Sequence, residues 1–215
     1  DHSDGSAFIL RDEEQCGVVG FVGGGQAPKI ASLNDGAETL GVGDTGFGEG
    51  FDLEAAPNRI QALIMLIRLL GEENAALACT APVPFQDISS GYWGRPYIAY
   101  AYEKGYTNGV EGNRFAPTRT ASVSMYTEFI LRALGYSDTR QTDISTAVDR
   151  ALVDGIITGG EKAALLGNSF LRSDVVYLSW YALDAPVRGS EQALYQRLES
   201  AGVFTDAAYQ SARSL

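Results

Sequence analysis

Apolar residues recur at helical spacing in three segments of similar length. These segments are residues 58–70, 122–134 and 171–183. Gly71 and Gly135 follow the first two segments, at the position where a helix end favours a residue with positive φ. The pattern therefore predicts three long helices, of which the first two end on a glycine.

A shorter helical stretch precedes each long one and ends before a glycine. The short stretches are residues 36–40, 96–104 and 144–154. An aromatic residue lies shortly before each long helix, namely Phe51, Phe115 and Phe170. Large aromatic side chains at regular positions are usually core residues. The repeating unit is therefore a short helix, a glycine-bearing loop with a buried phenylalanine, and a long helix.

The three long helices differ in how much of their surface is apolar. The first is apolar nearly all round, which indicates burial on several sides. On the second, Glu128 and Arg132 form an i,i+4 pair that we expect on the exposed face. Helices that cannot bury themselves alone pack against one another. The sequence predicts a mainly α fold of three helix-loop-helix repeats in a pseudo-threefold bundle.

The two ends of the chain have other patterns. Residues 7–10 and 16–22 are short apolar runs joined by a polar segment, which predicts a β-hairpin or extended arm. Near the other end, Ser190 can cap a helix that stops at Gly202. We therefore expect four parts, which are an arm over 1–35 and repeats over 36–80, 81–138 and 139–215.

Composition and charge exclude several classes of function. A net charge of −11 repels phosphate backbones, so nucleic acid is not an expected partner. The longest apolar run, residues 60–70, is far shorter than the roughly 20 residues that a membrane span needs. His2 is the single histidine, so no histidine-based acid–base pair is available. We expect no enzyme, no cofactor and no metal, and we interpret Asp1 as the mature end of an exported protein.

The two cysteines and one acidic loop leave alternatives open. Cys16 and Cys79 are too far apart in sequence for a close-spaced metal or redox motif. A disulfide between them would stabilise the fold by about 4 kcal/mol in the chain-entropy model, and two separate thiols are the other reading. Residues 44–52 carry three carboxylates in a glycine-rich loop, for which a solvated loop is favoured over a calcium site.

The middle of the chain resembles a known family. The matching segments are residues 84–88, 92–93, 101–105, 108–109, 115–117 and 131–135, which follow the S-layer homology pattern. That family begins its long helix with Thr-Arg-Ala-Glu. Arg59 and Arg172 take the place of its arginine, and Gln61 and Asp174 take its acidic place. The second repeat has no arginine at this position unless Arg119, one turn earlier, substitutes.

The resemblance implies non-covalent attachment to secondary cell-wall polysaccharide, often pyruvylated, by a secreted protein of the bacterial cell surface. A guanidinium can bind a carboxylate or ketal-bearing sugar. The glycan-binding residues expected on this basis are Arg59, Gln61, Trp93, Gly109, Arg119, Arg172 and Asp174. The alternative for Arg59 and Arg172 is a first-turn arginine exposed to solvent, with its stem packed on the bundle.

A second hypothesis is a subunit of a self-assembling extracellular filament or surface lattice. Residues 1–35 would then pair with a neighbouring copy as an added strand or arm. If so, light scattering should show larger particles for the full chain than for a version lacking residues 1–35. Equal, monomeric behaviour of both would count against assembly.

Overall fold

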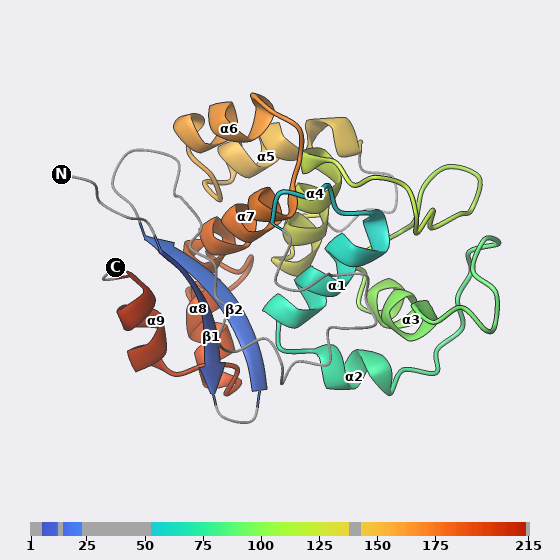
Figure 1. The fold of residues 1–215 in the computed structure, drawn as a ribbon, viewed down its shortest axis with the longest axis horizontal. Helices are drawn as coiled ribbons and strands as arrows, with labels where there is room; N and C mark the ends of the chain where they lie inside the picture. The colour runs from blue at the N-terminus through green and yellow to red at the C-terminus, as the bar shows by residue number, and fades with distance from the viewer. Residues whose placement is uncertain (1–5, 13–14, 23–52, 138–142, 214–215) are drawn as a thin grey trace.

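The three predicted long helices are present and form the centre of the fold. The computed structural model describes residues 6–12, 15–22, 53–137 and 143–213. The long helices are α1 (Arg59–Leu69), α4 (Val123–Ala133) and α7 (Arg172–Asp184). Each of them packs against the other two (Figure 1). Their shared interface buries Leu63, Ile64, Leu131 and Val175 completely. The mainly α architecture is therefore confirmed.

Hydrogen bonds at the helix starts fix how the long helices meet. Asn58 and Gln61 close a capping box on α1, with each side chain accepting the other's backbone N–H at 3.0 Å. The Arg59 N–H donates to the carbonyl of Arg119 at 2.8 Å, so α1 begins against the segment that leads into α4. The Arg172 N–H donates to Ala55 at 2.9 Å, which joins the start of α7 to the segment before α1.

Shorter helices cover this centre. Helices α2 (Glu73–Leu77) and α3 (Arg95–Glu103) pack against each other and against α1. A 3₁₀ turn at Ile144–Thr146 and α5 (Ala147–Val153) pack on α4, and α6 (Gly159–Leu166) follows. Two of the predicted short helices are thus found near their expected bounds, and the third, at 36–40, lies outside the described residues.

The predicted phenylalanines behave as core residues wherever the structure describes them. Phe115 is 0% exposed and Phe170 is 8% exposed, and Phe170 lies beside the ring of Tyr126. Phe51 lies outside the described residues. Burial of these two rings before α4 and α7 supports their interpretation as core residues of the repeat.

The predicted C-terminal helix begins later than Ser190. It is α8 (Leu194–Ser200), and Gly202 follows it with φ of +74°. Residues 186–193 instead form a turn in which Val187 N–H donates to Gln192 and Leu194 N–H donates to Ala185. The Ser190 hydroxyl accepts from Gln192 within this turn. The expectation was wrong because these backbone hydrogen bonds occupy the groups that a helix would have used.

An antiparallel hairpin and a last helix cover one side of α7. The hairpin consists of β1 (Ser6–Asp12) and β2 (Gln15–Val22), as expected from the two apolar runs. It contacts α7 and α9 (Asp206–Arg213), as Figure 1 shows. Pairing of residues 1–35 with another copy stays a prediction. No helix in the described parts of the chain is long and apolar enough to span a membrane.

The surface pair predicted on α4 is buried. Glu128 is 3% exposed, and its carboxylate forms ion pairs with Arg132 at 2.8 Å and with Arg150 of α5. The expectation of an exposed pair was wrong because α5 packs over this face of α4. Burial of a carboxylate requires such partners, since an isolated charge is costly to remove from water.

A buried hydroxyl pair between α4 and α7 gives a test of this packing. Tyr126 OH lies 2.6 Å from Ser179 Oγ, which itself donates to Val175. Ser179→Ala leaves the buried Tyr126 hydroxyl without its partner and should cost about 2 kcal/mol of unfolding free energy. Tyr126→Phe removes the hydroxyl itself and should cost only about 1 kcal/mol. Urea unfolding measures both, and the reverse order would contradict this packing.

Candidate functional site

Arg59 is a buried cation between two aromatic rings. It is the first residue of α1 and is 2% exposed. Its guanidinium carbon lies 5.0 Å from the ring centroid of Phe115 and 5.0 Å from that of Phe129, a residue of α4. The rings flank the cation because the start of α1 is hydrogen-bonded to the segment between Phe115 and α4. Cation–π attraction stabilises this placement.

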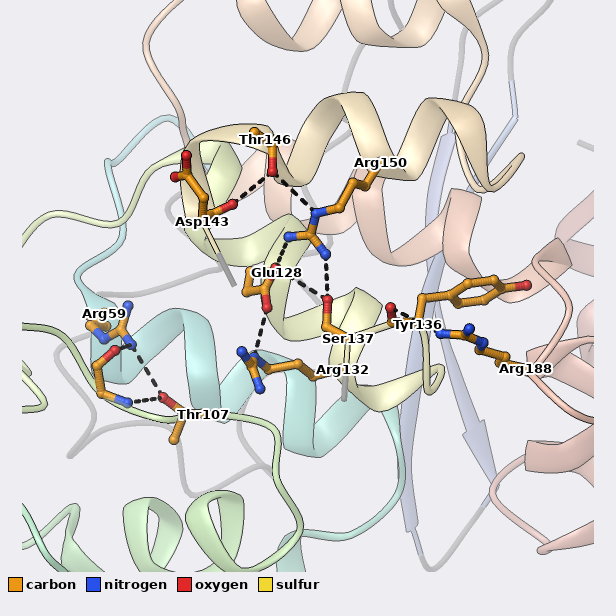
Figure 2. A network of polar contacts seen from close by, with 11 residues as sticks. Arg59, Thr107, Glu128, Arg132, Tyr136, Ser137, Asp143, Thr146, Arg150 and Arg188 are labelled. Atoms are coloured by element: carbon orange, nitrogen blue, oxygen red, sulfur yellow. Dashed lines mark hydrogen bonds and ion pairs between the residues drawn. The ribbon is translucent and has the colours of Figure 1, made fainter. Parts of the chain in front are cut away.

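Only part of the Arg59 guanidinium is hydrogen-bonded. Nη2 donates to Thr107 Oγ1 and to the carbonyl of Gly109, both at 3.2 Å, as Figure 2 shows for the labelled Thr107. Nε and Nη1 are buried and have no hydrogen-bond partner. A buried donor without a hydrogen-bond partner costs about 1–3 kcal/mol of stability, and more if the group is charged. The site therefore holds donor capacity that an anionic oxygen could use.

The loop that holds Arg59 needs glycine at position 109. Gly109 has φ of +78°, and its N–H donates to Thr107 Oγ1 at 3.2 Å. A Cβ at this position would lie 2.4 Å from the ring of Phe85 and 2.5 Å from the carbonyl oxygen of Arg114. Any residue with a Cβ would therefore clash at this position and would also be strained at this φ. Gly109 acts through its backbone, which presents the carbonyl that Arg59 contacts.

Several charges surround Arg59. Burial and, after it, the positive charges of Arg119 and Arg132 lower the pKa of its guanidinium to about 10, against the opposing effect of Asp87. Arg59 therefore remains cationic at neutral pH. The Asp87 carboxylate accepts the backbone N–H groups of Phe115 and Ala116 at 2.9 and 2.7 Å. These two hydrogen bonds fix the loop that carries Phe115, one of the two rings beside the Arg59 guanidinium.

The region around Arg59 is not acidic, although the whole chain is. Residues 84–132 contain five basic and four acidic side chains, whereas the chain has a net charge of −11. Charges beyond a Debye length of about 8 Å are largely screened at physiological salt. An anionic ligand at Arg59 therefore meets the local charges first.

Gln61 and Arg119 both lie close to Arg59, and each makes a structural contact at the start of α1, while their glycan-binding roles stay predictions. Gln61 caps the start of α1 through its side chain. Arg119 is exposed, and its carbonyl accepts the N–H of Arg59. Its charge acts on Arg59, so Arg119 joins the site of the first long helix. The position on α4 that corresponds to Arg59 is held by Val123, next to the cap residue Ser122.

Trp93, the aromatic residue among the expected glycan-binding residues, is exposed. It is 52% exposed, and its ring lies 5.6 Å from that of Tyr92. The adjacent Gly94 packs on Ile60, the neighbour of Arg59, because a Cβ on Gly94 would lie 3.1 Å from Ile60 Cγ1. The tyrosines Tyr97, Tyr100 and Tyr106 are buried instead and serve the core. Trp93 thus lies on the loop that covers the start of α1.

Arg172 and Asp174 lie at a different helix junction. Arg172 is 4% exposed at the start of α7, whose first residues are hydrogen-bonded to Leu53 and Ala55. The Asp174 carboxylate accepts the Leu171 N–H at 2.7 Å, and burial raises the pKa of this carboxyl. The alternative of a solvent-exposed first-turn arginine is thus wrong for both Arg59 and Arg172. The glycan role of Arg172 and Asp174 stays a prediction.

The remaining candidate chemistry involves residues outside the described parts of the chain. The Cys79 thiol donates to the Glu103 carboxylate at 3.7 Å, and the side chain of Cys16 lies outside the described residues, so their disulfide stays a prediction. The loop at 44–52, considered for calcium, also lies outside them. Within the parts of the chain that the structure describes, no group of acidic, histidine and cysteine side chains could hold a metal ion.

Sequence reasoning missed two residues of this site, Thr107 and Phe129. Thr107 is 1% exposed and binds Arg59 through its hydroxyl. Its position directly before Asn108 and Gly109 was the one available signal, because that pair belongs to the family pattern. Phe129 looked like any other apolar residue of α4. Nothing in the helical pattern distinguishes a ring that packs on a cation from one that packs on leucine.

Comparison with known proteins gives two similarities. Residues 84–122 match the family model of the S-layer homology domain. The chain is also similar to a protein named "Cell surface protein" from Thermoanaerobacter kivui, with 30% identity over 138 residues. That alignment covers 60% of this chain and 18% of the relative's own length. The two findings indicate a cell-surface module, and the matched domain contains Gly109, Phe115 and Arg119.

The steric role of Gly109 can be tested against a matched glycine. Gly109→Ala should displace the 107–109 loop, because the added Cβ meets Phe85 and a backbone carbonyl. Gly105 has a similar φ of +77° with nothing within 4 Å of an added Cβ. Gly105→Ala should therefore cost only the backbone strain, about 1 kcal/mol. Thermal unfolding should show a clearly larger drop in Tm for Gly109→Ala, and equal drops would contradict the assignment.

Proposed function

We propose that this protein attaches non-covalently to the bacterial cell wall by binding an anionic polysaccharide at Arg59. The match to the S-layer homology domain at residues 84–122 supports this proposal. The observation that supports this function is the buried guanidinium of Arg59, whose Nε and Nη1 have no hydrogen-bond partner. A protein tolerates such a cation at a cost in stability. A ligand with an anionic oxygen would remove that cost.

The chemistry of the site favours a carboxylate-bearing sugar, such as a pyruvyl ketal. Arginine donors form strong, charge-assisted hydrogen bonds to carboxylate oxygens. The rings of Phe115 and Phe129 flank the guanidinium and shield the interaction from water, which strengthens it. Binding of this kind involves no bond breaking, so the proposed function needs no catalytic group.

Access to Arg59 requires an outer contact first. Because the residue is 2% exposed, a sugar group reaches its guanidinium only when the neighbouring side chains yield. Arg119 is exposed beside it and offers the first positive charge that an anion meets. Trp93 is exposed on the loop over the start of α1, and its indole face suits stacking on a sugar ring. We assign these two residues to the outer part of the site.

A pull-down with cell walls tests this function. Purified sacculi that retain their polysaccharide should bind the native chain, and sacculi stripped of polysaccharide should not. Arg59→Met should weaken binding by roughly tenfold or more, because a charged hydrogen bond is worth more than 1.4 kcal/mol. The bound fraction at increasing protein concentration gives the affinity.

The control for this experiment is Arg68→Met. Arg68 also lies on α1, but it pairs with Glu73 at 2.8 Å, away from the 107–109 loop. Its loss should leave wall binding unchanged, because this half-buried pair includes none of the residues that hydrogen-bond to Arg59. Undiminished binding by Arg59→Met, or equal binding to stripped sacculi, would refute the proposed site.

A further inference from the structure

A line of charged contacts begins at the half-buried Arg150 of α5 and continues to buried residues of α4. Glu128 of α4 is 3% exposed, and its carboxylate contacts Arg132 Nε at 2.8 Å and the guanidinium of Arg150, which comes from α5. Ser137 hydrogen-bonds to both Glu128 and Arg150, as Figure 2 shows. The carboxylate is thus held between two guanidiniums from different helices, where its position is closely fixed.

The same line continues from Arg132 into the loop that holds Arg59. With the Asn108 amide oriented to satisfy both its ends, its oxygen accepts from Arg132 Nη1 at 2.8 Å and its nitrogen donates to the Thr107 carbonyl at 3.2 Å. Asn108 lies between Thr107 and Gly109, which are the two residues that hydrogen-bond to Arg59. One planar guanidinium therefore bridges Glu128 and the loop.

Arginine suits this bridging role better than lysine. Its planar group presents donors in fixed directions, so Nε can face Glu128 while Nη1 faces Asn108. A buried ion pair of this kind is weak evidence for stability, because the desolvation of its charges offsets their attraction. It does impose geometry, since removal of one partner leaves a buried charge without compensation.

We propose that Glu128, Arg132 and Arg150 are positioning residues that fix loop 107–109 through Asn108 and thereby orient the guanidinium of Arg59. Helix α5, which follows α4 in the chain, then contributes to the site at the start of α1 without touching it. The consequence for wall binding rests on the proposed function above, whereas the effect on Arg59 does not.

The side chain of Arg59 provides a direct readout that needs no ligand. Its buried Nε–H should exchange slowly with water in the native protein and give a distinct signal in a ¹H–¹⁵N NMR spectrum. Arg132→Met and Asn108→Leu should each raise its exchange rate by roughly tenfold, because the loop loses its link to α4. The backbone N–H of Leu63, in the centre of α1, serves as the internal reference for unchanged packing.

Arg68→Met is the matched control for this measurement. Arg68 is the tenth residue of α1, as Arg132 is of α4, and each pairs with a glutamate at 2.8 Å. Only Arg132 reaches the 107–109 loop, so Arg68→Met should leave the exchange of the Arg59 Nε–H unchanged. Asn108 is only half-buried, so Asn108→Leu carries the test if Arg132→Met fails to fold.

The outcomes separate the positioning role from wall binding. Unchanged Arg59 exchange in the folded variants overturns the proposal, and so does an equal rise at Leu63, which would indicate general loosening. Faster exchange at Arg59 alone supports it. If that occurs while native protein fails to bind polysaccharide-bearing sacculi, the positioning role stands and the proposed function is wrong. If the native protein binds, both variants should bind sacculi roughly tenfold more weakly.

Discussion

The fold depends on three long helices that can be buried only by one another. Helix α1 is apolar on nearly every side, so it needs α4, α7 and the shorter helices around it to exclude water. Hydrophobic burial causes the three helices to pack together, and the hydrogen bonds at their starts determine where they contact one another. The link from Arg59 N–H to the Arg119 carbonyl fixes α1 beside the segment that leads into α4. The same hydrogen bond positions the Arg59 side chain between the rings of Phe115 and Phe129.

Burial of charge in this fold follows from that arrangement. Arg59 enters the interface with α4 because it is the first residue of a helix whose start is enclosed. Glu128 and Arg132 become buried because α5 packs over the same helix. Charges in a low-dielectric interior interact strongly with their neighbours and lose solvation by water. The charges of α4 are therefore compensated by ion pairs within the chain. Arg59 Nε and Nη1 have no hydrogen-bond partner, and neither does Glu128 Oε1.

Local sequence signals accounted for the elements that depend on local chemistry. The predicted segments 58–70 and 122–134 begin at Asn58 and Ser122, which cap the two helices, and the apolar runs at 7–10 and 16–22 form the expected hairpin. The helix expected from Ser190 failed because a local cap signal lost to backbone pairing between residues 185 and 194. Helices α2, α6 and α9 were not predicted, because segments of five to eight residues are short enough to be taken for loops.

The sequence by itself determined the helical spacing, the glycines that end the first two long helices, and the arginine at the start of α1. Each of these follows from the chemistry of one residue and its near neighbours in the chain. Only the tertiary structure decided that Arg59 is enclosed, that Arg119 joins it, and that Glu128 lies inside the fold. Those facts arise from contacts between segments tens of residues apart. A side chain's exposure is set by what packs over it, which the local pattern does not contain.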